Sequence, residues 1–209
     1  RFYISPPVGR LSREEIDRGF YHYNCEVDEW FPVPKKKIVQ SFSCLANDDN
    51  LVYSIGGDWK TSPMLVQAFD YRTATWMKFP DSLFPHRLRS QSCALNGKVY
   101  VCNDHEIETF DYKAGKWEEL GSPLQQNYSD RYNEPSILKI LSYENMLWII
   151  GGPKDWRRSY KPNYSLATYN FVSQEWNTSR LLDEKVNFLP KKCGGLDNWE
   201  IKDVITFKT

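Results

Sequence analysis

The sequence predicts an all-β fold in which one four-stranded antiparallel unit recurs along the chain. Three observations support this prediction. Aromatic residues make up 15% of the 209 residues. The apolar runs are short and are separated by turn-forming residues, among them 11 Gly and 12 Pro. A motif built on aromatic residues and Asp or Asn recurs at long intervals. Aromatic residues favour strands, and short runs bounded by Gly and Pro are typical of strands joined by turns.

The recurring motif is an aromatic residue, then Asp or Asn, and then Trp seven residues after the first aromatic. Its four copies are Tyr23-Asn24 to Trp30, Phe69-Asp70 to Trp76, Phe110-Asp111 to Trp117, and Tyr169-Asn170 to Trp176. The successive Trp residues are 46, 41 and 59 residues apart. We interpret each copy as a β-hairpin. The aromatic residue ends a strand, Asp or Asn caps the turn through backbone N–H groups, and Trp opens the next strand with its ring between sheets.

A second mark is an apolar strand that runs into paired glycines. It occurs before Gly56-Gly57 and before Gly151-Gly152, whereas the strand at 98–102 runs into Asn103-Asp104. A last pair, Gly194-Gly195, precedes Phe207 by the 12 residues that separate Gly57 from Phe69. One more strand is expected upstream of most of these, at 40–45, 91–95 and 136–141. Each unit therefore has four strands.

This combination of marks resembles the kelch repeat, whose period is about 50 residues. The resemblance covers nearly the whole chain and implies a kelch-type β-propeller, in which radially stacked sheets cover each other's faces. We expect residues 1–209 to form one such domain, with blades at 38–80, 86–123 and 133–182 and partial blades at 2–34 and 185–209. About five blades of a six-bladed ring are then present, and the chain is expected to be part of a larger polypeptide.

The five cysteines show no zinc-binding spacing. Cys44 and Cys93 are predicted to occupy matching positions in first strands, and Cys102 to match the residue before a glycine pair. Free cysteines at such positions act as small apolar core residues. Three N-x-S/T sequons, at Asn127, Asn163 and Asn177, are close to the number expected by chance and do not establish secretion. A reducing, cytoplasmic location is therefore expected.

The charge balance bears on the class of partner. The chain carries 27 basic and 27 acidic residues. Nucleic-acid and membrane surfaces are anionic and favour proteins with a basic excess, so neither is expected as a partner. No apolar run approaches the ~20 residues that cross a bilayer. A protein or peptide partner is the expectation that remains.

Catalysis is not expected, and neither is a metal or another cofactor. The alternative is a metal-dependent propeller enzyme that resembles galactose oxidase. That resemblance would require two His and two Tyr around a copper ion. The three histidines, His22, His86 and His105, fall in different repeats and different elements. Residues 104–106 offer Asp, His and Glu side by side, but adjacent side chains diverge, which favours a solvated turn.

Binding is expected on one face of the propeller, where rigid blades present loops. The loops after the glycine pairs and the connections between blades open toward that face, and Trp, Tyr and Arg dominate interface energetics. The candidate partner-binding residues are Trp59, Trp156, Arg157, Arg158, Tyr160 and Trp199 in the loops, and Arg87, Arg89 and Arg131 in the connections. Two alternatives stay open: the indoles cover the core, or the arginines form a solvated rim.

The expected function is a non-catalytic protein-interaction scaffold. Two roles compete within it. The resemblance to kelch adaptors of cullin ubiquitin ligases implies a substrate adaptor that reads acidic peptides with arginines from the connections. The resemblance to actin-binding kelch proteins such as scruin implies a cytoskeletal or assembly role. An adaptor requires a BTB or F-box segment in the same polypeptide.

Overall fold

A computed structural model of the chain describes residues 2–4, 21–24, 26–36, 38, 40, 43–47, 50–57, 62–87, 90–124, 135–143, 145–153 and 164–181. This part of the chain contains fifteen strands and no helix. The first seven strands are β1 (Phe2–Ile4), β2 (Tyr21–Asn24), β3 (Glu29–Pro32), β4 (Cys44–Asn47), β5 (Leu51–Ile55), β6 (Val66–Asp70) and β7 (Thr75–Lys78). The others are β8 (Gln91–Leu95), β9 (Lys98–Cys102), β10 (Ile107–Asp111), β11 (Lys116–Glu119), β12 (Pro135–Tyr143), β13 (Met146–Pro153), β14 (Tyr164–Asn170) and β15 (Glu175–Leu181).

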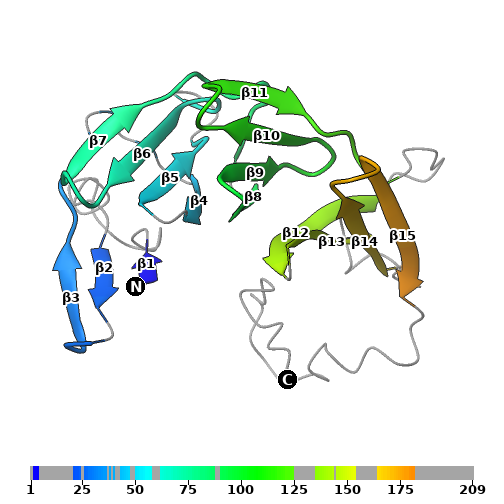
Figure 1. Cartoon of the computed structure of the whole chain (residues 1–209), viewed down its shortest axis with the longest axis horizontal. Helices are drawn as coiled ribbons and strands as arrows, with labels where there is room; N and C mark the ends of the chain where they lie inside the picture. The colour runs from blue at the N-terminus through cyan, green and yellow to red at the C-terminus, as the bar shows by residue number, and fades with distance from the viewer. Residues whose placement is uncertain are drawn as a thin grey trace.

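The strands form four antiparallel sheets in which sequence neighbours pair. Three sheets have four strands each, β4–β7, β8–β11 and β12–β15, and β1–β3 form a three-stranded sheet. The sheets follow one another around an open arc, with β4, β8 and β12 on its inner side (Figure 1). These first strands contact one another from sheet to sheet. This arrangement is that of kelch-type blades in a β-propeller, so the predicted fold class is confirmed.

Among the residues that the structure describes, no helix has the length and apolar character needed to cross a membrane.

Each predicted hairpin closes in the way that the motif indicates. The Asp70 carboxylate accepts a hydrogen bond from Arg72 N (2.8 Å), and Asp111 and Asn170 accept the equivalent bonds. Before the Trp strand the backbone enters the left-handed region, with φ 55° at Ala74 and 66° at Gly115. The side-chain oxygen accepts hydrogen bonds from backbone N–H groups that have no backbone acceptor in a tight turn. Because these contacts are local, the hairpin can be predicted from the sequence.

Two of the motif tryptophans, Trp76 and Trp117, bind their sheet to the connection that leads into it. Trp76 and Trp117 are 7% and 9% exposed. The Trp76 indole donates to Pro34 O (2.6 Å), and the Trp117 indole donates to Pro80 O (3.0 Å). The expectation of a ring packed between sheets is wrong for Trp30, which is 49% exposed.

The core lies between the sheets. One cluster of buried side chains joins the second and third sheets, and another joins the third and fourth. Tyr53 and Phe110 meet edge to face in the first cluster, with ring centroids 6.4 Å apart. Each sheet therefore depends on its neighbours for burial, as expected for a repeat architecture.

A strand was predicted at 40–45, and β4 is present there, but its predicted start is wrong, because β4 begins at Cys44. Gln40 instead sends its side chain into a polar network, described below. The prediction that Cys44 and Cys93 occupy matching positions is also wrong. Cys44 pairs with Ile55 in its sheet, whereas Cys93 pairs with Tyr100, two residues further along the equivalent strand. The shift is even, so both cysteines still lie on the same face.

Candidate interaction face

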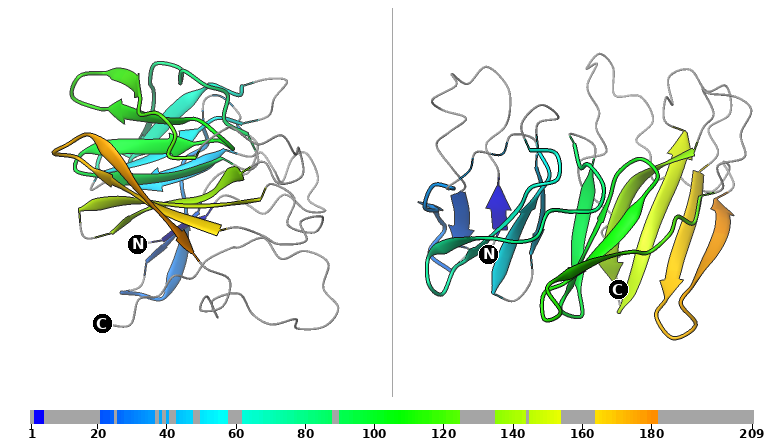
Figure 2. Two further views of the ribbon diagram at one scale, coloured as in Figure 1. Left: turned by 90° about the vertical axis from the view of Figure 1, so that its right-hand side faces the viewer. Right: turned by 90° about the horizontal axis from the view of Figure 1, so that it is seen from above.

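The connections between sheets and the ends of the second strands lie at the same edge of the blades. The hairpin turns that follow β6, β10 and β14 lie at the opposite rim (Figure 2). Gly57 N, at the end of the second strand of its sheet, donates to His86 O (3.0 Å) in the connection between β7 and β8. The loops and connections predicted to share one face therefore do meet at this point.

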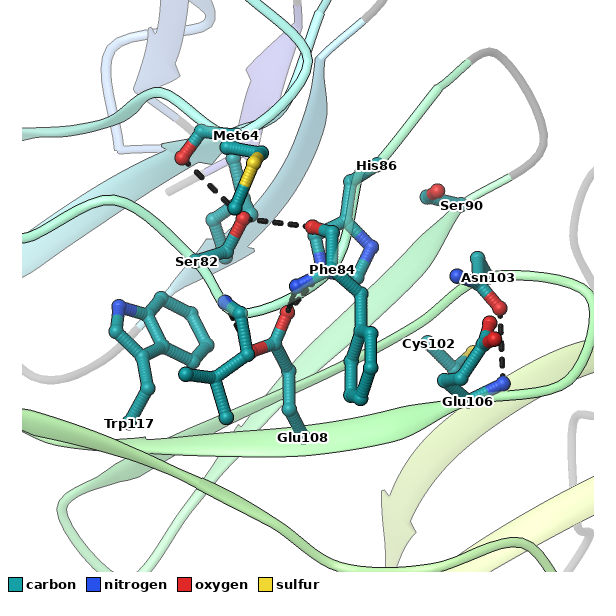
Figure 3. A network of polar contacts seen from close by, with 12 residues as sticks. Met64, Ser82, Phe84, His86, Ser90, Cys102, Asn103, Glu106, Glu108 and Trp117 are labelled. Atoms are coloured by element: carbon teal, nitrogen blue, oxygen red, sulfur yellow. Dashed lines mark hydrogen bonds and ion pairs between the residues drawn. The ribbon is translucent and has the colours of Figure 1, made fainter.

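The connection between β7 and β8 is anchored by a buried acid and imidazole. His86 and Glu108 both have fully buried side chains. The Glu108 carboxylate contacts His86 Nε2 and accepts hydrogen bonds from Leu83 N (2.8 Å) and, more weakly, from Phe84 N (3.4 Å). Figure 3 shows the carboxylate, which projects from β10, pointing into the turn of the connection. Because a buried carboxylate needs several donors, it holds this segment in one conformation.

The backbone of His86 is held as firmly as its side chain. His86 N donates to Pro63 O (2.7 Å). Gly56 lies directly beneath this residue, with φ +73°, and a Cβ at Gly56 would meet His86 O at 2.2 Å. Only glycine suits that position, because it accepts the left-handed conformation and leaves room for the neighbouring backbone. Gly56, the first glycine of the pair, therefore leaves the space that the backbone of the connection occupies.

Arg87 follows this buried anchor directly and is exposed. Arg87 N donates to Ser90 Oγ (2.9 Å), and Ser90 N donates to Arg87 O (2.8 Å). These two hydrogen bonds join Arg87 to Ser90 on the face of the connections. The structure therefore presents one predicted binding arginine to solvent on a fixed backbone.

The connection between β3 and β4 is anchored differently. The Gln40 amide nitrogen donates to Gly56 O and Leu65 O (both 2.8 Å), and its Oε1 accepts from Gln67 Nε2 (2.8 Å). Gln67 also donates to Ile38 O (2.8 Å). The anchor here consists of two neutral amides.

Lys36, in the same connection, donates to Ser54 Oγ (2.6 Å). Its ammonium nitrogen lies 5.4 Å from the centre of a Trp76 ring. Burial lowers the pKa of Lys36 to about 7, since a low-dielectric site disfavours the charged form.

The other predicted partner-binding residues fall outside the described part of the chain. They are Trp59, Arg89, Arg131, Trp156, Arg157, Arg158, Tyr160 and Trp199. Their part in binding stays a prediction.

The loop at 103–106 is closed by its own Asn. Asn103 Oδ1 accepts hydrogen bonds from His105 N (2.9 Å) and Glu106 N (2.8 Å), which makes a tight turn. Across the described ranges, no three His, Cys, Asp or Glu side chains lie close enough together to hold a metal ion.

Three cysteines lie in the described part of the chain, and all three are free thiols. Burial raises the pKa of Cys44 and of Cys93 to about 12, and it raises the pKa of Cys102 well above its usual value. A thiol in such surroundings stays protonated and is a poor nucleophile or metal ligand. The structural role predicted for these cysteines agrees with this chemistry.

The His86–Glu108 anchor was not predicted from the sequence. One signal for it exists. Gln67 and Glu108 stand at equivalent positions of the third strand, paired with Ser54 and Val101, and both are buried. A polar residue repeated at one buried position of a strand indicates a partner from outside the sheet.

Comparisons with known proteins agree with this architecture. No family model matches the chain. Two curated relatives do, both named F-box/kelch-repeat proteins, from Arabidopsis thaliana. One is 26% identical over 58% of this chain and 30% of its own length, and the other is 24% identical over 49% and 28%. The chain spans less than a third of the length of either relative.

The sheets and their repeated hairpins define a β-propeller made of repeats that bury their faces against one another. Within that class, the motif and the similarity to the two F-box/kelch-repeat proteins support a kelch-repeat family.

Proposed function

We propose that this chain is the substrate-binding propeller of a ubiquitin-ligase adaptor, and that it recognises an acidic segment of a protein partner without catalysing a reaction. The exposed position of Arg87, next to the buried His86–Glu108 anchor, carries this proposal. An arginine on a fixed backbone loses little conformational freedom on binding, and its guanidinium pairs with carboxylates through two hydrogen bonds.

The relatives support an adaptor over a cytoskeletal role, because both bear F-box in their names. An adaptor combines a ligase-binding segment such as an F-box with a substrate-binding propeller. Arg89, Arg131, Arg157 and Arg158 would extend the basic part of the face, and Trp59, Trp156, Tyr160 and Trp199 its aromatic part. The proposal also includes a reducing, cytoplasmic location, which suits the free thiols.

The test compares Arg87→Ala with Arg72→Ala. Arg72 is also an exposed arginine, and it lies on the hairpin turn between β6 and β7, at the opposite rim. Binding is measured on an array of acidic and neutral peptides and against the proteins retained from a native extract. We expect Arg87→Ala to weaken binding to acidic peptides about tenfold, and Arg72→Ala to leave it unchanged.

Equal binding by wild type and Arg87→Ala would contradict the proposal, as would loss in both variants. Co-sedimentation of the chain with actin filaments would favour the cytoskeletal role.

A further inference from the structure

The turn between β8 and β9 is a two-residue hairpin loop formed by Asn96 and Gly97. Leu95 pairs with Lys98 across the two strands, so the two turn residues lie beyond the last partners of the ladder. Both have left-handed backbone conformations, with φ 54° at Asn96 and 72° at Gly97. Tight hairpin turns prefer this pair of residues, because both accept a positive φ at low cost.

Both turn residues are exposed, and their polar groups are not engaged. Within the described part of the chain, neither the Asn96 side-chain amide nor the Gly97 N–H takes part in a hydrogen bond. A Cβ at Gly97 would meet no atom within 4 Å. Water and dissolved bases can therefore reach the asparagine amide and the backbone nitrogen that follows it.

Two other turn asparagines, Asn103 and Asn170, have side chains that are held in place. Each Oδ1 accepts hydrogen bonds from backbone N–H groups two and three residues further along the chain. The residues that follow them, Asp104 and Phe171, carry a side chain beside the backbone nitrogen. Asn96 is the only asparagine of the sequence that precedes a glycine.

Asn145, in the turn between β12 and β13, is the closest structural comparison. It is also exposed and left-handed, with φ 58°. The residue after it, Met146, begins β13 and pairs with Tyr143. The nitrogen that follows Asn145 therefore belongs to the ladder and stands beside a side chain. The nitrogen that follows Asn96 has neither constraint.

We propose that Asn96 is a spontaneous modification site, where a glycine N–H held outside the ladder lets water convert asparagine to aspartate and isoaspartate. The Gly97 nitrogen gives its proton to a dissolved base and attacks Asn96 Cγ, and an N–C bond forms. The Cγ–Nδ2 bond breaks, and Nδ2 leaves as ammonia after taking a proton from the protonated base. Water then adds to one of the two carbonyl groups of the cyclic imide, and the ring C–N bond at that carbonyl breaks. Opening at Cγ gives aspartate, and opening at the main-chain carbonyl gives isoaspartate.

The isoaspartate product changes the path of the backbone. Its main chain passes through the former side chain, which adds a methylene group to a two-residue turn. The turn of a hairpin fixes the register of its strands, so the longer link disturbs the pairing of Leu95 with Lys98. Because β8 contacts both β4 and β12, the disturbance extends to the neighbouring sheets, and the modified chain is less stable.

This turn lies at the rim opposite the connections. Lys98 pairs with Asp111, the residue that caps the hairpin turn after β10, and that turn belongs to the opposite rim (Figure 2). The modification therefore takes place away from Arg87.

The experiment ages the purified full chain at physiological temperature, at neutral and at mildly alkaline pH. Trypsin then releases residues 90–98 and 140–154, whose single asparagines are Asn96 and Asn145. Liquid chromatography with mass spectrometry measures the conversion of amide to acid and separates aspartate from isoaspartate. We expect Asn96 to convert at least about tenfold faster than Asn145, because the glycine nitrogen is unhindered. Isoaspartate should be among the products, and the rate should rise with pH.

The variant Met146→Gly separates the effect of the fold from that of the dipeptide. It gives Asn145 a following glycine that still lies in the ladder, and a thermal melt checks that the variant folds. Because the ladder must open before that nitrogen can attack, we expect Asn145 in this variant to remain at least about threefold slower than Asn96.

Equal conversion of Asn96 and Asn145 in the wild type would overturn the proposal. So would conversion of Asn96 without isoaspartate, or equal rates at the two asparagines in Met146→Gly. None of these results depends on peptide binding through Arg87, so this proposal and the proposed function fail separately.

Discussion

The two described connections have the same architectural task and different chemistry. Each leads into a four-stranded sheet and is held by a polar residue at the same position of the third strand, Gln67 in one and Glu108 in the other. Gln67 meets a second amide, Gln40, whereas Glu108 meets an imidazole with no water-exposed surface. In the fourth sheet, Ala167 stands at this position. In these two sheets the repeat therefore fixes the position of the residue that holds the connection. The chemistry of the contact differs between the two.

The difference predicts unequal consequences when an anchor is broken. Removing one member of a buried ionisable pair leaves the other without a partner, which costs about 3–5 kcal/mol. Removing a neutral amide leaves hydrogen-bonding groups unsatisfied, at about 1–3 kcal/mol.

The largest effect is therefore expected for Glu108→Ala. It leaves the His86 imidazole and the Leu83 and Phe84 amides without their acceptor. We expect it to lower the free energy of unfolding by about 3–5 kcal/mol, and Gln67→Ala to lower it by about 1–3 kcal/mol. Urea denaturation of both variants measures the difference. Equal losses would show that the His86–Glu108 anchor has no more weight than the Gln40–Gln67 anchor.

The second prediction concerns the glycine beneath His86. Gly56→Ala places a Cβ against His86 O in a left-handed conformation, while Gly97→Ala, at φ +72°, has no atom within 4 Å. Gly97→Ala should cost about 1–2 kcal/mol from the backbone conformation alone. Gly56→Ala should cost at least about 3 kcal/mol, because the connection must also shift. Thermal melts of the pair isolate the contact, and similar costs would contradict it.

The smallest effect is a pH dependence at the first connection. The pKa of Lys36 is lowered from 10.5 to about 7 on folding. Between these values the unfolded chain holds a proton that the folded chain has released, so this group makes the stability rise with pH from about 7 to 10. Lys36→Met should remove a rise of at most about 3 kcal/mol, measured by denaturation at pH 7 and pH 9.5.

The control for that series is Lys35→Met, which removes an exposed charge from the adjacent position. The two variants should differ in the slope of stability against pH. Parallel slopes would mean that Lys36 is no harder to protonate than its neighbour.

The hairpins were predictable because their causes are local. Asp70 caps a turn formed by the residues that follow it, and Trp76 opens the strand paired with the one that Asp70 ends. Such contacts span few residues, so they produce a residue spacing that can be recognised in the sequence. The sheets and the face of the buried cysteines follow from the same period.

The first strands and the connections were less predictable. A strand beginning at Gln40 fits the pattern as well as the observed one beginning at Cys44, because the sequence does not show which residues the Gln40 amide can reach. That amide bonds to Leu65 O, 25 residues away. His86 likewise seemed an ordinary turn residue, because its partner, Glu108, lies 22 residues downstream.

The sequence by itself determined the repeat: which residues form each hairpin, where its turn falls, and that the sheets must stack on one another to bury their aromatic faces. Only the tertiary structure decided how neighbouring sheets are joined. It placed His86 against Glu108, Gln40 against Gln67, and Lys36 against Ser54. The physical reason is that a buried polar group must find a partner, and in this chain those partners lie in other segments of the repeat array.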